Sequence, residues 1–184
     1  MSEQRACRLA EILQTYRVPE DPGGTSVFDA AVVTGRKAGE IAPVELTRTE
    51  IEMLLAEPAR MSDVHAVKIR ATAEAVARFP PPGGVETDNQ TDAFRHAYAS
   101  ALLTRRFGAD WTATFTAAHE GRAGNRPTSM AMDLFNNEVG RGIALAHPDA
   151  SAEELADLVH RAVLGGDLVV VAADGARLEW SGPR

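Results

Sequence analysis

The stretch from Thr91 to Gly108, TDAFRHAYASALLTRRFG, constrains the fold more than any other part of the sequence. At about 100° of helical rotation per residue, one face is apolar and consists of Phe94, Ala97, Tyr98 and Ala101. The nearly opposite face is also largely apolar, with Ala99, Leu103 and Phe107. A helix that is apolar on two sides packs against neighbours on both sides. The stretch therefore predicts the central helix of a helical core.

Two ionisable residues, Asp92 and His96, lie on the second apolar face of this predicted helix. Because they are four residues apart, their side chains can meet and form a hydrogen bond. The spacing thus predicts an ionisable pair directed into the protein. The alternative interpretation is a satisfied buried pair without a functional role.

The composition indicates one globular domain, with 184 residues of which 45% are hydrophobic and 24% charged. No segment approaches the roughly 20 apolar residues that cross a bilayer, and the N-terminus lacks a signal-peptide core. We therefore expect no transmembrane segment and a cytoplasmic protein, unless a dedicated secretion system exports it. The single cysteine, Cys7, excludes an internal disulfide and argues against a cysteine-based metal site.

The charge balance is acidic, with a formal net charge of −7 and a pI near 5.2. Because phosphate binding needs a basic surface, this balance argues against nucleic acid as a partner. The partners that stay open are a small-molecule or macromolecular substrate and a second protein. The sequence identifies none of them.

Apolar residues at helical spacing predict five to six helices in total. Near the C-terminus, an Asp174-Gly175 turn between two short strand-like runs predicts a β-hairpin. The predicted fold is therefore mainly α, a helical bundle with a small C-terminal hairpin. We divide it into an N-terminal helix with an irregular accessory segment, residues 1–43, and a helical domain, residues 44–184. The stretch from Val27 to Ile41 is ambiguous between strand and helix.

Residues that favour helix ends mark several boundaries. Two capping-box patterns, a hydroxyl residue three positions before glutamate, begin at Thr47 and Ser151. Gly108 fits the end of the central helix. The other predicted helix starts are N-caps at Ser62 or Asp63, at Asp110, and at Thr128 or Ser129.

A later predicted helix, MAMDLFNNEVGRGIALA, carries a polar flank beside its apolar stripe: Asp133, Asn136, Asn137 and Gly140. Asparagine and glycine each cost up to about 1 kcal/mol relative to alanine in a helix interior. Something local must offset this cost. We expect either contact with a ligand or close packing of another backbone against Gly140.

Polar groups on three predicted helices form a candidate site, because antiparallel neighbours in a bundle can direct side chains into one pocket. The groups are Asp92, Arg95 and His96 on the central helix, His119 and Glu120 at the end of the next helix, and Asp133, Asn136 and Asn137 on the third. P-loop, GxSxG, GxGxxG and EF-hand motifs are absent, and Ala123 rules out HExxH at His119. The other histidines are not part of such a polar cluster, and we interpret them as surface or packing residues: His65, His147 and His160.

Two chemistries stay open for this cluster. In the first, His96 is a general base whose tautomer Asp92 fixes, and Glu120 is the partner acid. Arg95 or Asn137 then stabilises developing negative charge. In the second, a divalent metal is held by His96, His119, Glu120 and Asp133. No spacing is specific for a metal, so none is required.

Three sequence blocks resemble an uncharacterised bacterial domain family that occurs as stand-alone proteins and at the C-termini of RHS and wall-associated polymorphic-toxin proteins. The blocks are DAFRHAYASALLTRRFG, the AHE of Ala118 to Glu120, and MDLFNNEVGR of Met132 to Arg141. With the upstream helices, the resemblance covers roughly Val44 to Val171. The chain departs from the family pattern at Ala99, where tryptophan is common, and in a shorter loop between Glu120 and Met130.

The resemblance implies an all-helical domain with a candidate site. Carried over by position, the site residues are Asp92, Arg95, His96, His119, Glu120, Asp133, Asn136, Asn137 and Arg141. Together, these observations favour a hydrolase of unknown substrate. The resemblance adds the possibility of a toxin-related role, which does not transfer automatically from the family. The alternative is a non-enzymatic binding or adaptor module in which the polar network is structural and the asparagines cap loops or bridge helices.

Overall fold

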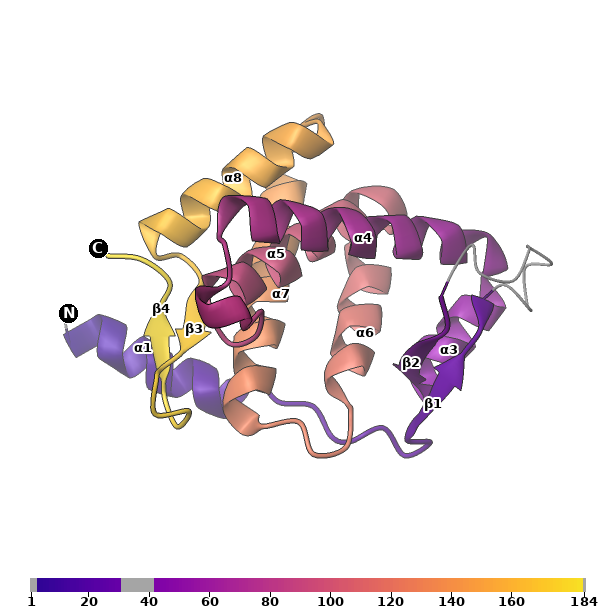
Figure 1. Ribbon diagram of the computed structural model, residues 1–184, viewed down its shortest axis with the longest axis horizontal. Coiled ribbons are helices and arrows are strands. Elements are labelled where there is room, and N and C mark those ends of the chain that lie inside the picture. The colour runs from indigo at the N-terminus through magenta and orange to yellow at the C-terminus, as the bar shows by residue number, and fades with distance from the viewer. Residues whose placement is uncertain (1–2, 31–41, 184) are drawn as a thin grey trace.

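The computed structural model describes residues 3–30 and 42–183, which form seven α-helices and two small antiparallel sheets (Figure 1). The mainly α prediction and the C-terminal hairpin are confirmed. The helices are α1 (Glu3–Thr15), α3 (Arg48–Ala56), α4 (Met61–Arg78), α5 (Gln90–Phe107), α6 (Ala109–Glu120), α7 (Pro127–Ala146) and α8 (Ala152–Gly165). The strands are β1 (Thr25–Phe28), β2 (Val44–Thr47), β3 (Val169–Val171) and β4 (Leu178–Trp180).

Helix α5 is the centre of the fold and contacts α4, α6, α7 and α8. Residues on both of its predicted faces are buried, including Phe94 and Leu103. Its closest neighbour is α7, where a Cβ atom added at Gly140 would lie 2.0 Å from the carbonyl oxygen of Ala97. Close backbone packing therefore accounts for the glycine inside α7, as one of the two sequence-based explanations expected.

The apolar interior consists of two clusters on opposite sides of α5. The larger one joins α1, α4, α5, α7, α8 and the β3–β4 hairpin, and contains Phe94, Tyr98 and Met132. The smaller one lies under β1, β2, α3 and α6 and contains Leu54 and Phe115. Most of the apolar residues of the smaller cluster also line a cavity.

The N-terminal segment contributes to both clusters. Helix α1 buries Leu9 and Ile12 in the larger cluster. Strand β1 pairs antiparallel with β2, with Thr25 opposite Thr47. Part of the stretch that the sequence left ambiguous is therefore strand, and its residues 31–41 lie outside the described residues.

Both capping boxes are confirmed, with Glu50 and Glu154 as the third helical residues of α3 and α8. The other three predicted helix starts are wrong. A 3₁₀ turn, Pro58–Arg60, runs directly into α4, so Ser62 and Asp63 lie inside its first turn. Gly108 ends α5 and also precedes α6, which places Asp110 in the first turn instead of at the cap. Helix α7 begins at Pro127, whose fixed φ suits a first helical position.

None of the described helices combines the length and the hydropathy that a membrane span requires.

Candidate functional site

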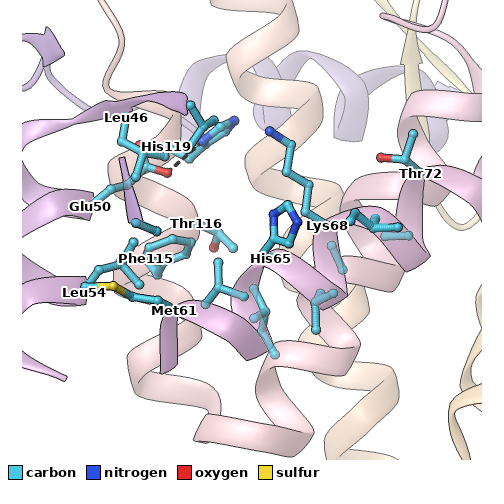
Figure 2. A pocket seen from close by; sticks show the side chains of 18 of the residues that line it. Leu46, Glu50, Leu54, Met61, His65, Lys68, Thr72, Phe115, Thr116 and His119 are labelled. Atoms are coloured by element: carbon cyan, nitrogen blue, oxygen red, sulfur yellow. Dashed lines mark hydrogen bonds and ion pairs between the residues drawn. The ribbon is translucent and has the colours of Figure 1, made fainter. Parts of the chain in front are cut away.

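A cavity of about 600 Å³ lies between the β1–β2 sheet and α3 on one side and α4, α5 and α6 on the other (Figure 2). Most of its wall is apolar. Polar side chains come from the central helix and its neighbours, and those predicted as site residues are Arg95, His96, His119 and Asn137. Predicted site residues from three helices therefore line one cavity, although the other predicted site residues do not.

Asp92 and His96 meet one turn apart on α5, with His96 Nε2 at 3.4 Å from Asp92 Oδ1. Asp92 is buried and also contacts the guanidinium of Arg95 through Oδ1. Its Oδ2 accepts a hydrogen bond of 2.7 Å from the backbone N–H of Asp88. Burial alone would raise the pKa of Asp92, but His96, Arg95 and the Asp88 N–H together hold that pKa well below its usual range.

Asp133 of α7 faces the same nitrogen, since its Oδ1 lies 3.5 Å from His96 Nε2. That oxygen is buried and makes no hydrogen bond. Burial, followed by the negative charges of Glu120 and Asp92, raises the pKa of Asp133 well above its usual range. His96 Nε2 thus lies between two carboxyl groups of opposite tendency. The lowered pKa of Asp92 favours its ionised form, and the raised pKa of Asp133 favours its neutral form.

A second carboxylate–histidine pair lies beside the first. His119 Nδ1, at the end of α6, is 2.9 Å from Glu50 Oε1 in the first turn of α3, as the dashed line in Figure 2 shows. The other oxygen of Glu50 accepts a hydrogen bond of 2.8 Å from the backbone N–H of Thr47, the reciprocal bond of the capping box. Burial opposes ionisation of Glu50, yet the His119 contact lowers its pKa below the ordinary value.

The two histidine rings are close, with centroids 6.5 Å apart. Both rings line the cavity. Each ring contacts a carboxylate through one nitrogen, Nε2 in His96 and Nδ1 in His119. The hydrogen bond or ion pair at one ring nitrogen determines which nitrogen exchanges protons with other groups.

Three ligand atoms in the described residues lie within 4.8 Å of one another and could hold a metal ion; they belong to Asp92, His96 and Asp133. Two of them, His96 and Asp133, are members of the predicted metal set. The other two predicted members have different partners, His119 with Glu50 and Glu120 with Asn125.

The remaining predicted site residues divide between the cavity and the core. Asn137 lines the cavity, whereas its neighbour Asn136 exchanges hydrogen bonds with the backbone of Val169 in β3. Asn136 thus bridges α7 to the hairpin, which is the structural alternative that the sequence left open. The Arg141 guanidinium donates a hydrogen bond of 3.4 Å to Thr116, a cavity residue, and burial lowers its pKa.

Glu120 is buried, and it accepts a hydrogen bond of 2.9 Å from the Asn125 side chain through Oε2. Its Oε1 is buried without a hydrogen bond. Glu120 acts on the site through its negative charge, which raises the pKa of Asp133. Glu120 does not line the cavity. The carboxylate that contacts His119 there is that of Glu50.

Comparison with protein-family models matches residues 51–166 to a family described as a domain of unknown function, DUF6973. This range is more than half of the chain. The protein belongs to the DUF6973 family. Comparisons with curated proteins and with solved structures give no significant match.

The DUF6973 match begins within α3 and ends at the glycine that caps α8, so it contains every predicted site residue. Glu50, the partner of His119, directly precedes it. Sequence reasoning missed Glu50 because the capping-box pattern already explained a glutamate at that position. The sequence predicts His65 to be a surface or packing residue, but it lines the cavity, together with Lys68 one turn later on α4.

Proposed function

We propose that this DUF6973 domain is a hydrolase in which His96 and His119 act as general base and general acid. The observation that carries the proposal is that two histidines, with ring centroids 6.5 Å apart, line one cavity and each contacts its own buried carboxylate. Cavities that combine apolar walls with a few convergent polar groups and shifted pKa values are typical of active sites.

The carboxylates define the role of each ring nitrogen. Asp92 favours a proton on Nε2 of His96, and this leaves Nδ1 to accept a proton from a water molecule as that water attacks the substrate. Glu50 accepts the Nδ1–H of His119, so when that ring carries a proton on both nitrogens, Nε2 is the atom that donates a proton to the leaving group. The water thus supplies the hydroxyl of one product and leaves its other proton on His96, while the leaving group takes a proton from His119. Transfer of a proton from His96 to His119, directly or through solvent, restores both rings for the next turnover.

Arg95 and Asn137 complete the proposed machinery. Both line the cavity, and both carry N–H donors that can stabilise an oxyanion. Arg95 also contacts Asp92, which holds the guanidinium near His96. This assignment replaces Glu120 with His119 as the partner acid.

The test compares His96→Ala and His119→Ala with His147→Ala, whose exposed side chain lies at the end of α7. A panel of chromogenic carboxylic esters and phosphodiesters identifies the hydrolysed bond in the wild-type protein. Each of the first two variants should lose about 100-fold or more in kcat/KM, the usual contribution of a general acid or base. Full activity in both variants, or no hydrolysis by the wild type, overturns the proposal and favours the adaptor alternative.

Metal-assisted hydrolysis is the second candidate mechanism. It is supported by the three clustered ligand atoms of Asp92, His96 and Asp133 and by the buried Asp133 oxygen that makes no hydrogen bond. Calorimetric titration of Zn²⁺ and Mn²⁺ into the wild type and into Asp133→Asn distinguishes the mechanisms. Binding that Asp133→Asn abolishes, with activity that depends on the bound ion, favours the metal.

We extend the proposal to a toxin-related hydrolase of bacteria that acts in the cytoplasm. The support is the resemblance of the three sequence blocks to domains at the C-termini of polymorphic-toxin proteins. Induced expression in a bacterial host should then inhibit growth, and the His96→Ala variant at the same protein level should not. Equal growth with both proteins overturns the extension and leaves the hydrolase itself untested by this experiment alone, so the enzyme assay above is run in parallel.

A further inference from the structure

Most of the cavity wall is hydrocarbon, although His65, Lys68, Thr72 and Thr116 also line it. Leu46 and Leu54 contribute from β2 and α3, Val64 and Val67 from α4, and Leu103 and Phe115 from α5 and α6. Figure 2 shows Leu46, Leu54 and Phe115 gathered around the Glu50–His119 pair. A ligand group that binds in this part of the cavity leaves water and contacts apolar side chains. This transfer is favourable for a hydrocarbon group.

Among the described residues, the same cavity also has a positive charge without an ion-pair partner. The two carboxylates that contact the cavity histidines are already paired. Asp92 contacts Arg95 and His96, and Glu50 contacts His119. Lys68 also lines the cavity, and it has no ion pair among the described residues. A ligand with a negative charge at one end complements this lysine.

We infer that the substrate is an acyl compound, an ester or thioester of a hydrocarbon-chain carboxylic acid, whose chain occupies the apolar cavity. This inference rests on the proposed hydrolase. Water adds its oxygen to the acyl carbon and gives a proton to His96, the bond from that carbon to the ester oxygen or sulfur breaks, and the leaving atom takes a proton from His119. The products are an alcohol or thiol and a carboxylic acid, and a proton passes from His96 to His119 through solvent to restore both rings. The acid then releases its proton to water, and the resulting carboxylate is the negative charge that Lys68 complements.

The position of Ala99 makes the chain-binding region testable. Ala99 lines the cavity on α5, one turn after His96, and is partly exposed to it. Tryptophan at this position would fill apolar space in the cavity without replacing a histidine or its carboxylate partner. Ala66 of α4 is exposed and outside the cavity lining, so Ala66→Trp is a matched control.

The experiment measures binding of hexanoate, octanoate, decanoate and dodecanoate to the full chain by calorimetry, below their micelle concentrations. Affinity should rise about fourfold per added methylene until the cavity is full, the gain expected for complete burial of each methylene. Ala99→Trp should remove the gain for the longer chains, and Ala66→Trp should keep it. Circular dichroism checks that each variant is folded.

A second wall variant keeps the test valid if Ala99→Trp does not fold. Ile69 lines the cavity but is 57% exposed, so Ile69→Glu places a charge on the wall with little effect on the core. This variant should weaken dodecanoate binding at least tenfold and hexanoate binding much less. Equal affinity for all four chain lengths, or unchanged binding in both wall variants, overturns the inference.

Hydrolysis of p-nitrophenyl esters from acetate to decanoate separates this inference from the proposed function. Turnover without any dependence on chain length overturns the acyl-chain assignment and supports the hydrolase. Chain-dependent alkanoate binding in both the wild type and His96→Ala, without turnover of any ester, supports the acyl cavity and overturns the hydrolase. Turnover that increases with chain length and fails in His96→Ala supports both.

Discussion

The two carboxylate–histidine pairs are alike in chemistry and different in construction. Asp92 and His96 are neighbours on one turn of α5, whereas Glu50 and His119 are 69 residues apart and meet only because α3 packs against α6. Both carboxylates are almost fully buried, at 3% and 1% exposure. The side chain of His96 is 15% exposed and that of His119 is 42% exposed.

The surroundings of the two carboxylates also differ. Asp92 belongs to a network that includes Arg95, the backbone of Asp88 and, through His96, Asp133. Glu50 has two partners, the backbone of Thr47 and His119. The first pair is thus part of a charged network, whereas in the second a helix-capping glutamate uses its other oxygen to contact a histidine.

The largest expected effect is that of Asp92→Ala on stability. The substitution leaves Arg95, His96 and the Asp88 N–H without their shared acceptor, and removing one partner from a buried ionic network costs about 3–5 kcal/mol. Urea unfolding followed by circular dichroism measures the loss. Glu153→Ala, which removes an exposed partner of Arg70, should cost less than about 1 kcal/mol. A similar loss in both variants would remove the distinction between network and surface pair.

Glu50→Ala should cost less than Asp92→Ala, about 2 kcal/mol, because it removes one helix cap bond and one partner of a half-exposed histidine. The same urea experiment measures it. His119→Ala reports whether the histidine or the cap accounts for the loss. If Glu50→Ala is the more damaging of the two carboxylate variants, the description of Glu50 as a modified cap is wrong.

Asp133→Asn should stabilise the protein at pH 8 by about 1 kcal/mol, because it replaces a buried acid with a neutral group of similar shape. The sign follows from the raised pKa of Asp133 in the folded protein. Such a group gives its full stability below its unfolded pKa and loses it as the pH rises through the folded pKa. The difference between variant and wild type should therefore disappear in acid. A variant that is less stable at pH 8 would mean that Asp133 is ionised and paired with His96.

The smallest expected effect is a difference in the pH at which the two pairs lose their contribution to stability. Lowered pKa values mean that both carboxylates contribute stability above their unfolded pKa and lose it as the pH falls through the folded pKa. In the unfolded chain, glutamate titrates at about pH 4.3 and aspartate at about pH 3.9, so as the pH falls Glu50 begins to lose its contribution first. The stability gap between wild type and Glu50→Gln should thus close at a higher pH than the gap for Asp92→Asn, by a few tenths of a kcal/mol at each point. Thermal melts between pH 3 and pH 7 provide both curves, and coincident curves would contradict the comparison.

The sequence predicted what depends on neighbouring residues. Periodicity identified α5 and its double apolar face, and spacing identified the Asp92–His96 contact. Both capping boxes were found because their signal spans only four residues. The β3–β4 hairpin was found for the same reason, since its turn is local.

What depends on chain segments far apart could not be predicted in the same way. The Glu50–His119 contact requires the packing of α3 on α6, which no local pattern encodes. Asn136 and Asn137 are adjacent and chemically identical, yet one bonds to β3 and the other lines the cavity. The choice between them depends on where β3 passes α7. The wall from β1 and β2 was missed because the pairing of these strands joins residues about 20 apart.

The contact between Gly140 and Ala97 has a consequence for the precision of the site. Ala97 adjoins His96 on α5, and Gly140 lies two turns after Asp133 on α7, so this contact sets how far apart the two helices stand at the polar cluster. A methyl group at residue 140 would meet the Ala97 carbonyl and push the helices apart. It would thereby lengthen the gap between His96 and Asp133 without a change in either side chain. The distance between these two polar side chains is therefore set by a residue that has no side chain of its own.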